Sequence, residues 1–190
     1  MIRVRNRAML VRSSATLALL LGAVLPFAAC LETGGSEVYA CPDKGVFTGQ
    51  DADGGPPVAS VSTLLERRCG TLDCHGSLYR PMRIYGRYGL RAPSEGNVTG
   101  GKATTTFEHG ANYGAVCSIE PDKMAEVTAD FGQSADQLLF LRKARGVEGH
   151  KGGAAVTPGS DADECILGWL RGDDLATVSS RCQLAIDALE

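Results

Sequence analysis

Residues 58–76 read VASVSTLLERRCGTLDCHG, and this stretch decides the fold. Its apolar residues recur at helical spacing with charged residues between them, so it predicts an amphipathic helix over 58–68. The helix runs directly into Cys69, Cys74 and His75. The stretch therefore predicts a helical domain with these three side chains at its functional site.

Two thiols followed by an imidazole are the residue types that hold a haem covalently. The thiols add to the vinyl groups of the haem, and the imidazole binds its iron. Here four residues separate the cysteines instead of two. Cysteines five apart are displaced by roughly 140° on a regular helix, so the chain must unwind between them. Gly70 lowers the cost of that distortion.

Two other uses of the same residues stay open. Cys69 and Cys74 are also able to close a small disulfide loop with His75 merely adjacent. Alternatively Cys69, Cys74, His75 and a distant histidine would bind structural zinc, although an oxidising compartment disfavours thiolate sites.

The order of features along the chain resembles cytochrome c-like domains of envelope proteins in myxobacteria and planctomycetes. The shared features are the helix, the Cys-x4-Cys-His motif, an arginine- and tyrosine-rich segment at 79–91, a His-Lys-Gly-Gly loop and a final helix containing Trp169. The resemblance covers about 58–172. It implies a small, mainly α, cytochrome c-like fold with long loops, haem c held by Cys69, Cys74 and His75, and one-electron transfer.

The second axial ligand is expected on a loop before the final helix, as in small cytochromes. His150, in the glycine-lined loop 149–153, lies there and is the first choice. Met124 is the second, because a thioether would raise the reduction potential. Met82 and His109 are the other candidates, and His109, in a threonine-rich polar stretch, is expected at the surface.

The arginine- and tyrosine-rich segment has three interpretations, one of which is a basic patch that docks a partner on an otherwise acidic protein. Arg80 or Arg83 would pair with haem propionates, which favour bidentate cationic donors. The slightly preferred alternative is a turn-rich surface segment whose tyrosines pack on the domain.

The remaining cysteines predict disulfides. A final helix is expected at 163–170 and another at 135–143. Cys165 on the final helix would bridge to Cys182 in a following turn. If haem takes Cys69 and Cys74, Cys41 would form a disulfide with Cys117. In an exported protein such bridges are expected to form.

Residues 1–29 predict an export signal. Four arginines precede an apolar run that is too short to span a bilayer permanently, and small residues precede Cys30. The segment 27–30 resembles a lipobox, with Phe27 where leucine is usual, so Cys30 is expected to carry lipid and anchor the protein to a membrane. An ordinary secretory signal cut near Ala29 is the alternative. With lipid on Cys30, the protein is expected to be an envelope lipoprotein, on the periplasmic face or at the outer membrane.

Charge and composition set the remaining expectations. Without the signal, 15 basic and 22 acidic residues remain, a net charge of −7, which argues against nucleic acid as a partner. Residues 30–57 are rich in Gly, Pro and Asp and predict a flexible tether, and 58–190 predict one domain.

Two functions are weighed. The first is a lipid-anchored monohaem electron carrier with a periplasmic redox partner. The second is a cofactor-free lipoprotein held by three disulfides that serves as a structural or binding module. Motifs typical of hydrolases are absent, so an electron carrier or a binding protein is expected rather than an enzyme.

Overall fold

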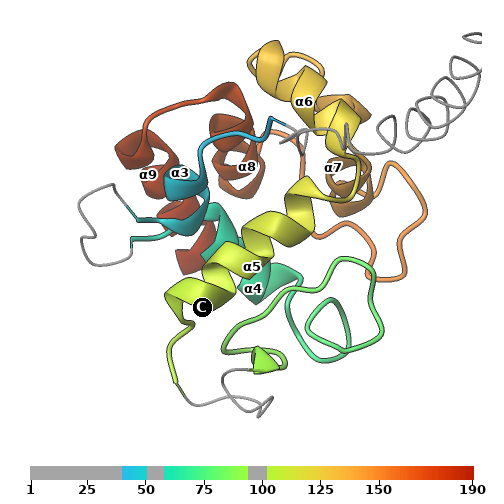
Figure 1. Ribbon diagram of the computed structural model, residues 1–190, viewed down its shortest axis with the longest axis vertical. Helices are drawn as coiled ribbons and strands as arrows, with labels where there is room; N and C mark the ends of the chain where they lie inside the picture. The colour runs from blue at the N-terminus through green and yellow to red at the C-terminus, as the bar shows by residue number, and fades with distance from the viewer. Residues whose placement is uncertain (1–39, 51–57, 94–101) are drawn as a thin grey trace, which may run out of the picture. The chain divides into compact units, whose positions relative to one another are not determined.

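The computed structural model describes residues 40–50, 58–93 and 102–190, which lie in one unit, Tyr39–Glu190. The described residues form helices and turns and contain no strand, so the expected mainly α fold is confirmed (Figure 1). The α-helices are α3 (Lys44–Thr48), α4 (Val61–Arg68), α5 (Thr106–Cys117), α6 (Pro121–Ala129), α7 (Leu139–Ala144), α8 (Asp161–Arg171) and α9 (Leu175–Asp187). A 3₁₀ turn, η2 (Ala135–Gln137), precedes α7. No helix of these described ranges has the length and apolar character needed to cross a bilayer.

The core forms around Trp169 of α8, which is fully buried. Its ring meets Phe47 of α3 edge to face at a centroid distance of 4.9 Å, and Phe47 in turn meets Tyr113 of α5 at 5.5 Å. Trp169 Nε1 donates to the carbonyl oxygen of Asp43 at 3.0 Å. The Tyr113 hydroxyl donates to the carbonyl oxygen of Pro42 at 3.0 Å. Trp169 and Tyr113 thus pack their rings in the core while the indole N–H and the hydroxyl each find a hydrogen-bond acceptor.

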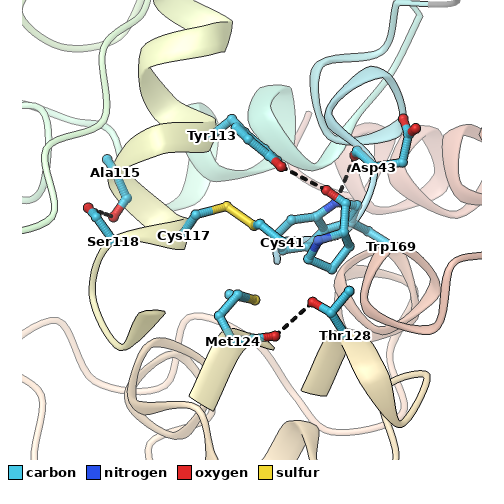
Figure 2. The surroundings of a disulfide bond; sticks show 10 residues. Cys41, Asp43, Tyr113, Ala115, Cys117, Ser118, Met124, Thr128 and Trp169 are labelled. Carbon is cyan, nitrogen blue, oxygen red and sulfur yellow. Dashed lines mark hydrogen bonds between the residues drawn. A yellow bond between two sulfur atoms is a disulfide. The ribbon is translucent and has the colours of Figure 1, made fainter. Parts of the chain in front are cut away.

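Residues 40–50 belong to this core, which corrects the expectation that the tether extends to residue 57. Phe47 is fully buried, and Asp43 caps α3 by accepting from the backbone N–H of Val46 at 2.9 Å. Cys41 is bonded to Cys117 at the end of α5 (Figure 2). A short helix with one large apolar residue resembles a linker in sequence, but a single buried aromatic and a disulfide hold it in place. Residues 30–39 and 51–57, and the expected signal at 1–29, lie outside the described residues.

The expected disulfides Cys41–Cys117 and Cys165–Cys182 are both present. The second joins α8 to α9, which pack side by side (Figure 1). Cys182 was expected in a turn and instead lies inside α9. The correction has a visible cause, because Asp174 caps the helix by accepting from the backbone N–H of Thr177 at 2.9 Å. The apolar residues that follow recur every three or four positions and are buried: Val178, Cys182, Ala185 and Ile186.

The other expected helices exist with shifted ends. The helix expected over 58–68 begins at Val61, because Ser60 accepts from the backbone N–H of Thr63 and ends the preceding extended segment. The helix expected over 135–143 is interrupted at Leu138, whose backbone is extended between η2 and α7. The final expected helix begins two residues early at Asp161.

Candidate cofactor-binding site

The chain unwinds immediately after α4, as the spacing of the two cysteines requires. Cys69 caps the helix, and residues 70–79 form successive turns. The backbone N–H of His75 donates to the carbonyl oxygen of Cys69 at 2.8 Å, so the five-residue step folds back on its start. A Cβ at Gly76 would lie 2.0 Å from the carbonyl oxygen of Gly70, which explains why glycine is needed at this crossing.

These turns border a cavity of about 560 Å³, a volume within the range of small-molecule sites. Other lining residues come from α7 and from the loop that follows it. The lining residues are Cys69, Asp73, Cys74, His75, Arg80, Pro81, Met82, Ile119, Leu139, Phe140, Lys143, Ala144, Gly149, His150, Lys151 and Gly152. The four residues preferred from sequence for haem binding, Cys69, Cys74, His75 and His150, therefore meet at one cavity.

His75 is held in a defined orientation. Its Nδ1 lies 2.6 Å from the carbonyl oxygen of Met82, which only accepts hydrogen bonds, so Nδ1 carries the proton. The lone pair of Nε2 is left for another partner. Burial lowers the pKa of His75, with neighbouring His150 and Arg80 acting in the same direction and the Met82 hydrogen bond opposing them. The neutral imidazole that results is the form that binds metal ions.

His150 repeats this arrangement from the other wall. Its Nδ1 lies 3.1 Å from the carbonyl oxygen of Gly153, so the same argument leaves its Nε2 free. The two imidazole rings are 5.8 Å apart between centroids and inclined by 20°. Two imidazole nitrogens on opposite sides of one metal ion are separated by roughly 4 Å, since each bond is about 2 Å. Each ring centroid lies roughly 1 Å beyond its nitrogen, so the centroids of two such ligands would be slightly more than about 6 Å apart, and the rings would have to move apart from their stacked position to hold one ion between them.

The two cysteines of the motif are free thiols. Cys69 is buried, and burial raises the pKa of its thiol to about 11, with Cys74 adding to the shift and Arg68 opposing it. Without a bound ligand this thiol is protonated at neutral pH, and it must lose its proton to bind a metal ion or to react as a nucleophile. Within the described ranges no three His, Cys, Asp or Glu side chains are grouped so as to hold a metal ion.

The cavity is lined by three cations and one acid. The cations are Arg80, Lys143 and Lys151, and the acid is Asp73; Lys143 Nζ also lies 3.7 Å from Glu148 Oε1. Lys143 Nζ donates to the carbonyl oxygen of Gly149 at 3.0 Å and so joins α7 to the His150 loop. This excess of positive charge suits a ligand that carries carboxylates.

Arg83, the other arginine considered for propionates, is not among the residues that line the cavity. Its guanidinium stacks over the ring of Tyr85 at 4.6 Å, and within the described part of the chain its Nε and Nη2 have no hydrogen-bond partner. Of the two arginines considered for propionates, Arg80 therefore lines the cavity and Arg83 stacks on Tyr85.

Two alternative axial ligands are placed elsewhere. Met124 is 2 % exposed in the core on α6 and does not line the cavity. His109 was expected at the surface and is buried on α5, where its Nδ1 lies 2.8 Å from Ser62 Oγ. The expectation for His109 was wrong because its polar neighbours in sequence are themselves buried, notably Glu108 and Asn112. Met82 contributes its carbonyl to His75 and also lines the cavity.

The sequence did not reveal which apolar residues form the walls. Phe140, Leu139 and Ile119 come from α7 and from the segment before α6. The apolar pattern of 135–143 predicted a helix, but no signal in it distinguishes a core face from a cavity face.

Comparisons with known proteins add no relative. No protein-family model, curated protein or solved structure matches the chain. The resemblance to cytochrome c-like domains therefore stays a prediction, and the function must be argued from the residues of this chain.

Proposed function

We propose that the protein is a lipid-anchored, monohaem c-type cytochrome-like electron carrier of the cell envelope. One observation carries the proposal: two imidazoles face one cavity, each with Nδ1 bonded to a backbone carbonyl and Nε2 left for a metal. Two free thiols line the same cavity. This donor set suits haem better than zinc, because haem brings its own four equatorial nitrogens and asks the protein for axial ligands only.

Each residue has a role that follows from its position. Cys69 and Cys74 would form the two thioether bonds, His75 would bind the iron proximally and His150 distally. The carbonyl of Met82 orients the His75 ring and raises its basicity. A bound haem would supply the one-electron couple of its iron.

The walls of the cavity perform the other tasks. Leu139, Phe140 and Ile119 exclude water from the apolar part of the ligand. Arg80, Lys143 and Lys151 would neutralise the propionates. If His75 and His150 both held the iron, no coordination position would be left for a substrate, which would favour electron transfer over catalysis.

The location of the protein is part of the proposal. Lipid on Cys30 would hold the mature chain at a membrane, since its net charge of −7 gives no attraction to anionic headgroups. The partner would be another redox protein of the periplasm, and nucleic acid is not expected to bind.

Serine variants of the motif test covalent attachment. In cells that mature c-type cytochromes, Cys69→Ser with Cys74→Ser is expected to remove all haem that survives denaturing electrophoresis, because both thioether bonds are lost. A matched Cys165→Ser, Cys182→Ser variant removes two cysteines that are already paired and should keep its haem stain. Equal staining of the wild type and the motif variant, or none in either, would contradict the proposal.

A further inference from the structure

A buried polar cluster lies between α4 and α5, away from the cavity. Glu66 of α4 is 3 % exposed and His109 of α5 is 6 % exposed. Ser62 Oγ contacts His109 Nδ1 at 2.8 Å and also accepts from Asn112 Nδ2 at 3.1 Å. Neither Glu66 nor His109 has a part in the proposed haem chemistry. Burying ionisable groups costs free energy unless hydrogen bonds or ion pairs compensate for the lost water.

The carboxyl group of Glu66 is only partly satisfied. Its Oε2 accepts from the Thr104 hydroxyl at 2.6 Å. Its Oε1 has no hydrogen-bond partner in the described ranges and lies 3.4 Å from His109 Nδ1. Burial raises the pKa of Glu66 from 4.5 to about 7, the Thr104 hydrogen bond opposes this, and Glu108 adds to it.

Other charged groups nearby are accounted for. Glu108 is bonded to Arg91, with 2.6 Å between Oε2 and Nη2. Burial raises the pKa of Glu108, but hydrogen bonds from the Arg91 side chain and from two backbone N–H groups outweigh it and bring the pKa to about 2. Arg91 and the backbone N–H of Arg87 lower the pKa of Glu66. Burial lowers the pKa of His109 and Glu108 opposes it.

The segment 82–90 joins this cluster to His75. On one side, the Met82 carbonyl bonds the His75 ring, Ile84 N donates to the His75 carbonyl oxygen at 2.9 Å, and Leu90 N donates to that of Gly76 at 2.9 Å.

On the other side, the same segment rests on the cluster. Asn112 bonds both the N–H and the carbonyl oxygen of Tyr85, at 2.7 and 2.8 Å. A Cβ at Gly86 would lie 2.5 Å from the carboxyl carbon of Glu66, so the backbone there packs directly on the carboxyl group. The position of segment 82–90 therefore depends on the charge of the Glu66 carboxyl group.

We propose that Glu66 and His109 form a proton-binding pair whose deprotonation loosens segment 82–90, and with it the hold on His75. When the proton leaves, a buried carboxylate with one unpaired oxygen remains, and it is stabilised only if water or a donor reaches it. The backbone at Gly86 covers it and must move first. The consequence for electron transfer rests on the proposed haem function, whereas the titration itself does not.

The sign of the effect follows from the raised pKa. Glu66 has a pKa of about 7 in the folded protein and 4.5 as its ordinary value. Between these values the folded state holds more protons than the unfolded state. The contribution of Glu66 to the stability of the fold is therefore fully present below pH 4.5 and is lost as the pH rises through 7. His109, with a lowered pKa, acts oppositely and stabilises the fold above its ordinary value of 6.5.

The experiment uses the mature protein as purified. Nuclear magnetic resonance should show the backbone amides of Ile84 and Leu90 shifting with a midpoint near pH 7, and Glu66→Gln should abolish the shift. Relative to the wild type, the unfolding equilibrium constant of Glu66→Gln should fall by about 10- to 100-fold between pH 5 and 8. In His109→Gln, the loss of stability as the pH rises from 5 to 7 should be steeper than in the wild type. Glu126→Gln, which changes an exposed carboxyl group on α6, should match the wild type throughout.

The outcomes separate the two proposals. Amides that do not titrate between pH 6 and 8, or that titrate alike in the wild type and Glu66→Gln, would overturn the proton-binding pair, whatever the haem content. If Glu66→Gln does not fold, the wild-type amides and His109→Gln still decide. Protein that lacks haem yet shows the titration would support the pair and remove only its link to electron transfer.

Discussion

Replacing His75 with alanine is expected to lower the ratio of haem to protein at least about tenfold. Haem must be held beside Cys69 and Cys74 while the thioether bonds form. Removing even a hydrogen-bond partner of a metal ligand weakens such binding about 10- to 100-fold, and this change removes the proximal ligand itself. The His75 ring is fixed by the Met82 carbonyl, and its backbone bonds both Cys69 and Ile84. No other histidine of the described residues lies on this wall of the cavity. Absorption spectroscopy against protein concentration measures the ratio.

The two histidines are expected to differ in effect. The His150 ring is bonded only within its own loop, to Gly153, so His150→Ala should retain haem and lose the low-spin spectrum of a six-coordinate iron. Glu126→Gln, which changes an exposed carboxyl group on α6 away from the cavity, is the control, and its spectrum should equal that of the wild type. Unchanged haem content and spectrum in His75→Ala would exclude His75 as the ligand.

Replacing Trp169 with alanine is expected to destabilise the fold by about 3–5 kcal/mol. The indole is fully buried, packs on Phe47 and Tyr113, and donates to the Asp43 carbonyl oxygen. Its removal leaves a cavity at the centre of the core and a buried acceptor without its donor. Urea unfolding measured by circular dichroism gives the change.

An exposed aromatic on a neighbouring helix provides the comparison. Phe107 of α5 is 62 % exposed, so Phe107→Ala should change stability by no more than about 0.5 kcal/mol. A loss below about 1 kcal/mol in Trp169→Ala would show that the core is not organised around this residue.

Part of this fold could be read from the sequence and part could not. The helices α4 and α8 were predicted because each has apolar residues at helical spacing, and α8 also has acidic residues at its start. The helix α5 was missed because its buried side chains are polar, with Glu108, His109 and Asn112 among them. Such residues are buried only because partners far along the chain satisfy them, and no local pattern records those partners.

The candidate site followed a similar division. Cys69, Cys74 and His75 were found because their chemistry is written in adjacent residues, and His150 because glycines mark its loop. The Met82 carbonyl could not be predicted, since any residue offers the same backbone oxygen. Met124 was proposed from its residue type, but the packing of α6 against α8 places it in the core. Residue type suggests what a side chain can do, whereas tertiary packing decides whether it reaches the site.

The central claim is that one haem is covalently bound through Cys69 and Cys74. Intact-mass spectrometry of the mature protein, with a pyridine haemochrome spectrum of the same sample, tests it most directly. The account predicts a mass increased by one haem, four cysteines in two disulfides, and the spectrum of a haem with both vinyl groups saturated. A mass without haem, with Cys69 and Cys74 oxidised as a third disulfide, would contradict it and favour a cofactor-free structural or binding module.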